Sequence, residues 1–254
     1  MNIAVIFAGG TGQRMGTSVP KQFLEVNGKP IIIYTLQLFE YHNEIDRIYV
    51  SVLEDYIPYV EELCRDYHIT KVRAVVAGGD NRQDSIYNAL KAAEAENPSD
   101  SIVLIHDGVR PYVTYETISN NIAGVKKNGN AITATGCNET ILISEDGGCS
   151  VSMVPYRRNT YAAQAPQSFY LGDIIECHDI VRAKPERYED LVDNCTLVRS
   201  LGREVHMVEG NRGNIKVTTP EDVFQFRALL QYNENELALG IGDSMTARLK
   251  RFRK

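Results

Sequence analysis

The stretch that decides the fold is AGGTGQRMG at residues 8–16, with PKQ close behind it at residues 20–22. It directly follows an apolar run of strand length at residues 3–8, and glycines commonly end a strand. Glycine also lets the backbone approach a ligand and turn its N–H groups towards anionic oxygens. Arg14 and Lys21 add two permanent positive charges. Amides and cations at the end of a first strand predict a polyphosphate-binding site.

Two well-known phosphate loops differ from this one. The dinucleotide fingerprint needs a small residue where Met15 stands and a helix that continues from the turn, which Pro20 disfavours. The Walker loop needs Gly-Lys-Ser/Thr, and the chain has no such tripeptide. A plain glycine turn would explain the glycines but not the nearby arginine and lysine. An NAD(P)-dependent oxidoreductase and a nucleotide-binding module without turnover remain alternatives, because a fold alone proves no chemistry.

The first half of the chain alternates between two patterns. Short apolar runs predict strands, at residues 3–8, 48–53, 72–77 and 102–106. Amphipathic or helix-favouring stretches predict helices between them, at residues 30–39, 58–67 and 85–95. This alternation predicts an α/β protein with a Rossmann-like, doubly wound, mostly parallel sheet.

The pattern changes after about residue 130. Strand-like runs at 131–135 and 139–144 precede EDGG at 145–148, a hairpin turn signal, and 150–154 continues the hairpin. We expect an inserted β-arm at about 137–160 that serves dimerisation, and packing of the hairpin on its own domain is the alternative. Further on we expect helices at 171–183, 189–200 and 220–232, and strands at 204–208 and 214–217. The expected organisation is one domain over 1–232 and a C-terminal tail over 233–254.

Composition narrows the class of protein. The chain has 254 residues, 43% of them hydrophobic, and a net charge of −6, which argues against a nucleic-acid partner. No signal peptide and no apolar run of about 20 residues are present, so we expect no membrane span. Five scattered cysteines indicate reduced thiols in the cytoplasm, and five scattered histidines argue against a zinc site. The basic end at residues 248–254 is expected to be solvated, although such an end can also touch anionic surfaces.

Five segments carry a resemblance to a known family. AGGTGQRM with PKQ resembles the signature of sugar-nucleotide-type nucleotidyltransferases. Four later segments resemble the cytidylyltransferases that act on 2-C-methyl-D-erythritol 4-phosphate or ribitol 5-phosphate: GGDNRQDS at 78–85, HDGVRP at 106–111, APQSF at 165–169 and NIKVT at 214–218. The resemblance runs in order from about residue 2 to 232.

The sequence departs from the family pattern at two positions and leans towards one branch. Ala165 and Val192 stand where the family usually has threonine. The glycine pair at 9–10 and HDGVR at 106–110 are more similar to the ribitol branch, and the methylerythritol branch is the alternative.

The resemblance implies transfer of CMP from CTP, with Mg²⁺, to a phosphorylated polyol. It implies that the catalytic cations are Arg14, Lys21 and Lys216. The implied nucleotide-binding residues are Ala8, Gly9, Gly10, Thr11, Gly12, Gly79, Arg82, Ser85, Asp107 and Gly108. The implied acceptor-binding residues are Asp107, Arg110, Arg157 and Val192. Because the family arginine reaches the acceptor from the partner's arm, Arg157 implies a homodimer with composite active sites.

Several of these residues have simpler alternatives. Ser85 could be an ordinary helix-start residue. Asp107 could hold Mg²⁺, a ribose or the acceptor, or could only pair with Arg110. Lys216 could be a solvated lysine, and Arg157 a solvated arginine of the hairpin beside Arg158.

Overall fold

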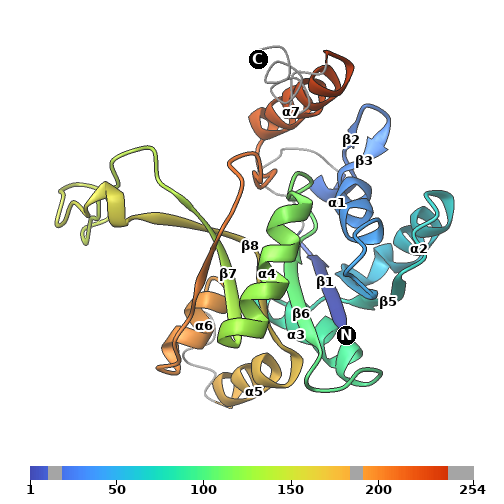
Figure 1. Ribbon diagram of the computed structural model, residues 1–254, viewed down its shortest axis with the longest axis horizontal. Helices are drawn as coiled ribbons and strands as arrows, with labels where there is room; N and C mark the ends of the chain where they lie inside the picture. The colour runs from blue at the N-terminus through green and yellow to red at the C-terminus, as the bar shows by residue number, and fades with distance from the viewer. Residues whose placement is uncertain (11–18, 184–190, 240–254) are drawn as a thin grey trace, which may run out of the picture.

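A computed structural model describes residues 1–10, 19–183 and 191–239 and shows one large twisted sheet (Figure 1). In this sheet β8 is antiparallel to both of its neighbours, and every other pair of neighbouring strands is parallel. The predicted α/β class with a mostly parallel sheet is therefore confirmed. Within the described residues the strand order is β5 (Val72–Ala77), β4 (Arg47–Val52), β1 (Asn2–Ala8), β6 (Ile102–Asp107), β8 (Tyr161–Tyr170), β7 (Asn130–Gly136) and β9 (Met207–Glu209).

Helices cover both faces of this sheet, and each face has its own apolar core. On one face the strands pack against α1 (Ile31–Glu40), α2 (Ile57–Asp66) and α4 (Tyr115–Asn128). The other face packs against α3 (Arg82–Glu94), α5 (Leu171–Arg182) and α6 (Asn194–Ser200). A small two-stranded sheet, β2 (Glu25–Val26) and β3 (Lys29–Pro30), precedes α1. Short 3-10 turns occur at Lys21–Phe23, Glu54–Tyr56 and Arg157–Asn159.

Helix α3 begins earlier than residue 85, where the sequence placed it. The side chain of Asn81 caps the helix by accepting a hydrogen bond of 2.9 Å from the backbone N–H of Asp84. An N-cap side chain of this kind satisfies one of the otherwise unpaired N–H groups of the first turn. The helix therefore starts at Arg82, and Ser85 lies inside its first turn rather than at its start.

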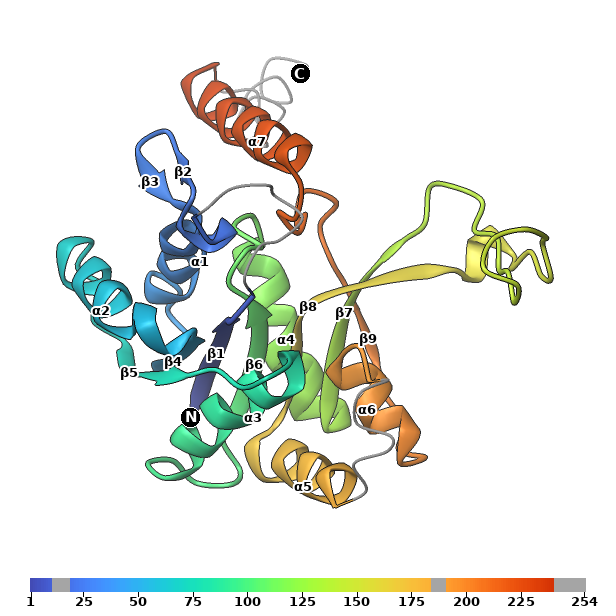
Figure 2. The ribbon, with the colours of Figure 1, turned by 180° about the vertical axis from the view of Figure 1, so that it is seen from behind.

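The arm is present, but its strands differ from those predicted. A ribbon of β7 and β8 leaves the body and carries residues 137–160 at its far end (Figures 1 and 2). The strands expected at 139–144 and 150–154 do not form, and one bridge joins Ile143 to Met153. The described chain leaves this tip largely exposed, and a two-stranded ribbon without a covered face is only marginally stable. Asp146 instead organises the turn by accepting from the N–H groups of Cys149 and Ser150.

The last described helix is longer than predicted. Helix α7 (Pro220–Leu239) passes without a break across residue 232, where the family resemblance ends. Its Phe226 is fully buried against Val26, Ile31, Val109 and Val217, so the helix is anchored beside the strand ends. Residues 214–217, expected as a strand, are irregular, and α6 begins at Asn194 instead of 189. No helix in the described ranges is both long and apolar enough to span a bilayer, and the basic end at 248–254 lies outside them.

Candidate active site

The site lies where the chain reverses its order in the sheet. After β1 the chain builds β4 and β5 on one side and then returns to place β6 on the other side of β1. The carboxyl ends of β1 and β6 therefore lie side by side, with Phe7 in register with Asp107. In open α/β sheets this crevice is the usual ligand site.

A cavity of about 300 Å³ opens at this point. Its wall combines the ends of β1 and β6, the loop between β5 and α3, and the segment that precedes α7. Lys21 and Lys216 line it from opposite ends of the sequence, and Gln22 fixes the first loop by donating 2.7 Å from Nε2 to the carbonyl of Ala8. Gly9, Gly10 and the two lysines therefore line the same cavity.

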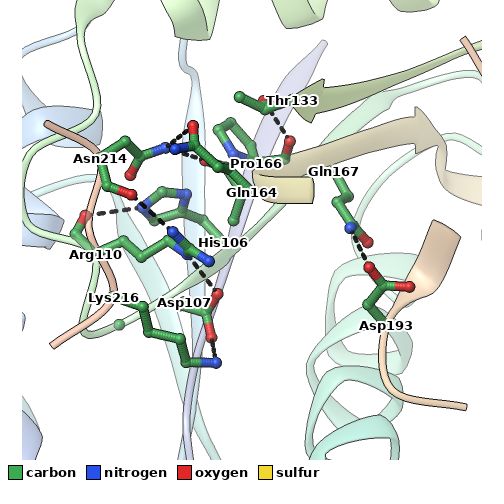
Figure 3. Close-up of polar contacts among 12 residues, drawn as sticks. His106, Asp107, Arg110, Thr133, Gln164, Pro166, Gln167, Asp193, Asn214 and Lys216 are labelled. Atoms are coloured by element: carbon green, nitrogen blue, oxygen red, sulfur yellow. Dashed lines mark hydrogen bonds and ion pairs between the residues drawn. The ribbon is translucent and has the colours of Figure 1, made fainter. Parts of the chain in front are cut away.

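Asp107 is the charge centre of the cavity (Figure 3). Its side chain is only 3% exposed, and Lys216 Nζ lies 2.5 Å from Oδ1. Arg110 Nε donates to Oδ2 at 3.1 Å, and Arg82 Nη2 lies 3.7 Å from the same oxygen. One buried carboxylate therefore holds three cations from three separate segments of the chain.

The cations explain why this buried carboxylate is ionised. Burial opposes the charge of Asp107, but Lys216, Arg82 and Arg110 together outweigh it and hold the pKa of Asp107 far below its ordinary value. Burial in turn lowers the pKa of Lys216, while the negative charge of Asp107 counteracts that effect. The group is thus a compact cluster with an excess of positive charge next to the cavity.

Arg82 ties the cavity to a distant segment. Its Nη1 donates a hydrogen bond of 2.9 Å to the carbonyl of Val192, and its guanidinium lies 4.7 Å from the centre of the Phe7 ring. The next residue, Gln83, donates 3.0 Å to the carbonyl of Leu191. The backbone at 191–192 is therefore held beside the start of α3, while Val192 as a whole is 70% exposed.

Two positions of the loop between β5 and α3 are packed too closely for any residue but glycine. A Cβ on Gly79 would collide with the Cβ of Asp84, and one on Gly78 would lie 2.9 Å from Ser85 Oγ. Ser85 Oγ accepts from Gly79 N at 3.1 Å and donates to the Asn81 carbonyl at 3.0 Å. Ser85 therefore holds the loop in shape, which goes beyond a simple helix-start role.

A second hydrogen-bonded layer supports the cavity from behind (Figure 3). Arg110 Nη1 donates a hydrogen bond of 2.7 Å to the Asn214 carbonyl. Asn214 Nδ2 in turn donates one of 2.6 Å to the carbonyl of Ala165. His106, fully buried, faces the Arg110 carbonyl with Nε2 at 3.0 Å. Burial lowers the pKa of His106 to about 4, so the ring is neutral at physiological pH. The blocks at 106–111, 165–169 and 214–218 thus form one scaffold.

The structure distributes the predicted residues over three places. The cavity wall contains nine of them: Ala8, Gly9, Gly10, Lys21, Gly79, Arg82, Ser85, Asp107 and Lys216. Gly108, Arg110 and Val192 flank the cavity without lining it, and Arg157 lies on the arm. Thr11, Gly12 and Arg14 lie outside the described residues.

Arg110, which we predicted to bind the acceptor, is held by two protein partners. Its Nε and Nη1 are occupied by Asp107 and Asn214, and its side chain is 13% exposed. This arrangement favours a supporting role. Conversely, the sequence reasoning did not assign Gln22 or Asn81, although both lie within the quoted PKQ and GGDNRQDS segments.

The described residues offer limited protein ligands for a divalent cation. They contain no group of three or more His, Cys, Asp or Glu side chains that could hold a metal ion. Asp107 faces the cavity, but Lys216 and two arginines already surround its oxygens. Mg²⁺ usually combines one or two carboxylates with substrate phosphates. The site therefore fits an ion carried in on a triphosphate better than an ion held by protein alone.

A cavity lined by glycine amides and two lysines, at the point where the strand order of a doubly wound sheet reverses, is typical of a nucleotide-binding α/β protein. Comparisons with known proteins define its family. The family model of the 2-C-methyl-D-erythritol 4-phosphate cytidylyltransferases matches residues 2–232, so the chain belongs to this family. Its relatives are cytidylyltransferases, which makes it a nucleotidyltransferase and excludes the oxidoreductase alternative.

Sequence relatives fall into two activities. The chain is 45% identical to the ribitol-5-phosphate cytidylyltransferase of Streptococcus agalactiae serotype Ia over 95% of its own length and all of the relative's. It is 44% identical to the enzyme of the same name from Vibrio parahaemolyticus, over 94% of its length and all of the relative's. Identity to a 2-C-methyl-D-erythritol 4-phosphate cytidylyltransferase of Clostridium botulinum is 36%, over 91% of this chain and 97% of the relative's.

A solved structure agrees with the fold. The 4-diphosphocytidyl-2C-methyl-D-erythritol synthase of Anaerococcus prevotii superposes with a TM-score of 0.78 at 31% identity. The match covers 91% of this chain and 96% of the other.

Proposed function

We propose that the protein transfers CMP from CTP to D-ribitol 5-phosphate, giving CDP-ribitol and pyrophosphate. The observation that carries the nucleotide half is the cavity at the ends of β1 and β6, where glycine amides, Lys21 and Lys216 converge. The acceptor half is supported by the relatives named for ribitol 5-phosphate, which are 44–45% identical, against 36% for the methylerythritol relative.

The cavity divides the work of binding CTP between two loops. The amides after β1 and the Lys21 ammonium face the triphosphate, with Arg14, Thr11 and Gly12 in the same sequence loop. The loop at Gly79, held by Ser85, faces the base with its backbone groups. A site that pairs the edge of cytosine would leave buried polar groups unpaired with uracil, and such mismatches are costly.

The reaction is an in-line displacement at phosphorus. An oxygen of the acceptor phosphate bonds to the α-phosphorus of CTP, and the bond from that phosphorus to the pyrophosphate oxygen breaks. The acceptor needs no general base, because a phosphate monoester with a second pKa of about 6 is mostly ionised at neutral pH. The protein's task is to align two anions and to neutralise charge on the phosphoryl oxygens.

Asp107 orients the cation that serves this task. Its contact of 2.5 Å fixes the Lys216 ammonium at the cavity wall, and its charge counteracts the lowering of the Lys216 pKa by burial. Lys21 lines the same cavity. A bound Mg²⁺ ion would neutralise further charge on the phosphates, and the carboxylates of the described residues that line the cavity are those of Asp80 and Asp107.

The acceptor site requires a second protomer. Arg157 lies on the projecting arm and not in its own cavity, so we propose that it reaches the site of a partner in a homodimer. The exposed side chains of the arm support this assignment, because large exposed apolar patches mark interfaces. More than half exposed are Leu142, Val151, Met153, Val154 and Tyr156.

A mixing experiment tests the composite site. Lys21→Ala and Arg157→Gln protomers are each expected to be inactive as homodimers. In a random mixture, half of the dimers are mixed and each holds one intact site, so about a quarter of wild-type activity returns. Recovery of no activity, with mixed dimers demonstrated by mass, would show that each site is built within one chain.

A substrate panel tests the proposed reaction. Four nucleoside triphosphates are each combined with Mg²⁺ and with D-ribitol 5-phosphate, 2-C-methyl-D-erythritol 4-phosphate and other polyol phosphates, and pyrophosphate is measured. We expect the highest kcat/KM for CTP with D-ribitol 5-phosphate. A preference for 2-C-methyl-D-erythritol 4-phosphate would support the methylerythritol branch of the family instead. No turnover with any pair would support a nucleotide-binding module without catalysis. Lys21→Ala should lower kcat by two to three decades, the usual effect of losing one electrostatic contact of about 3–4 kcal/mol.

A further inference from the structure

A second and larger hollow lies at the root of the arm, outside the nucleotide cavity. Its volume is about 600 Å³. The end of β7, the turn at Arg157–Asn159 and the segment after β9 form its wall. Three arginines line it: Arg157, Arg158 and Arg212.

The three arginines are exposed, and no carboxylate in the described part of the chain forms an ion pair with any of them. Arg157 Nη1 donates a weak bond of 3.3 Å to the Asn138 carbonyl, and Arg158 lies 5.6 Å from the centre of the Tyr156 ring. Three like charges around one hollow repel one another unless an anion lies between them. Planar guanidinium groups suit phosphate oxygens because they can donate two parallel hydrogen bonds.

The position of Arg212 follows from the way the chain passes the arm. Strand β9 pairs with β7, and Gly210 N donates 2.9 Å to the Ala134 carbonyl. A side chain on Gly210 would collide with Gln164 and Thr133, so the backbone lies tightly against the arm's root. Asn211 Nδ2 then donates 2.8 Å to the carbonyl of Tyr112. The backbone on the N-terminal side of Arg212 is thus fixed, and the same segment continues to Lys216 in the nucleotide cavity.

We propose that Arg158 and Arg212 join Arg157 in one site for the dianionic phosphate of the acceptor. This inference rests on the proposed function and extends it. The body of one protomer contributes Arg212 and its arm contributes Arg157 and Arg158, and the partner contributes the nucleotide cavity that this phosphate faces. Tyr156 and Tyr161 line the same hollow and offer apolar faces for the carbon chain of a polyol.

Steady-state kinetics of Arg158→Gln and Arg212→Gln test the site, with CTP and D-ribitol 5-phosphate varied separately. Loss of one charge-assisted hydrogen bond should raise the acceptor KM about tenfold to a hundredfold and leave the CTP KM within about twofold. The matched control is Arg65→Gln, an exposed arginine on α2 at the other end of the sheet, which should change neither constant. Melting temperatures within a few degrees of wild type establish that the variants fold.

The pH dependence of the acceptor KM gives a readout that a structural role would not change. In the wild type KM should rise as the pH falls below about 6, because the acceptor phosphate becomes a monoanion there. This rise in the acceptor KM should be smaller in both variants, because with less positive charge they bind the dianion less selectively over the monoanion. Inorganic phosphate should compete with the acceptor in the wild type and compete less well in both variants.

The outcomes separate this inference from the proposed function. A wild-type enzyme without CMP transfer to any polyol phosphate would overturn both. An active wild type whose Arg158→Gln and Arg212→Gln variants keep the acceptor KM, its pH profile and the inhibition by phosphate would overturn the three-arginine site alone. In that case Arg157 would remain the arm's contribution to acceptor binding.

Discussion

Replacing Asp107 with asparagine should destabilise the empty enzyme far more than its one-atom change suggests. Asparagine keeps the shape and one oxygen acceptor, but it leaves Lys216, Arg110 and Arg82 clustered without their carboxylate. Removing one partner of a buried ion pair costs about 3–5 kcal/mol. Lys216 and Arg82 can reach water through the cavity, since their side chains are 30% and 34% exposed. The lower value of about 3 kcal/mol therefore applies.

This loss is measurable by urea unfolding and by thermal melting. For a domain of this size 1 kcal/mol corresponds to about 2–4 °C, so Tm should fall by about 6–12 °C. Glu176→Gln is the control, because it removes the carboxylate of an exposed pair with Arg203 and should cost less than about 1 kcal/mol. Saturating CTP with Mg²⁺ should restore part of the loss, since the triphosphate supplies negative charge to the same cations.

The pH dependence of the free energy of unfolding shows whether ionised Asp107 is the stabilising form. The pKa of Asp107 is held well below the unfolded value of about 3.9, so its contribution is fully present above about pH 4 and is lost as the pH falls further. The stability difference between wild type and Asp107→Asn should therefore be constant from pH 8 to 5 and shrink below pH 4. If the substitution changes the free energy of unfolding by no more than Glu176→Gln does, the charge cluster is not the centre of the site.

Three further predictions concern the loop, the histidines and the cap of α3. Gly79→Ala should abolish measurable CTP binding in calorimetry while the protein stays folded, because a Cβ there collides with Asp84; normal CTP affinity would remove this loop from the site. Burial lowers the pKa of both His106 and His178 to about 4, below the unfolded value of about 6.5. The unfolded chain then binds the extra protons, so stability should fall as the pH falls from about 6.5 towards 4, by about 2 kcal/mol per histidine at pH 5. His178→Gln should reduce that slope in urea titrations, and an unchanged slope would contradict the assignment. Asn81→Ala should cost about 1 kcal/mol of stability through loss of the helix cap, and it should raise the CTP KM because the capped turn carries the loop; a change in stability without a change in KM would separate the two roles.

The sequence was most informative where short-range chemistry determines structure. Continuous apolar runs and glycines placed β1, β4, β5 and β6 to within a residue or so, because buried parallel strands need apolar side chains throughout. The rule that parallel strands share an edge for their carboxyl ends placed the site at the end of the first strand, but the family resemblance was needed to bring Lys216 and Asp107 into it. The family resemblance supplied the residue roles that this rule cannot.

The sequence was less informative where structure depends on distant contacts. The strands predicted in the arm have the right side chains, but nothing in the described chain covers them, and so they form a single bridge. The contact that holds Arg110 Nη1 comes from the carbonyl of Asn214, over one hundred residues away. Arg212 carries no local signal, because it reaches the arm only through the pairing of β9 with β7.

A crystal structure of the protein with CTP and Mg²⁺ tests the central claim most directly. The account predicts the triphosphate against the amides of Gly9 and Gly10, between the ammonium groups of Lys21 and Lys216, with the cytosine facing the loop at Gly79. A nucleotide bound elsewhere, with both lysines turned to bulk water and the cavity at the ends of β1 and β6 empty, would contradict it.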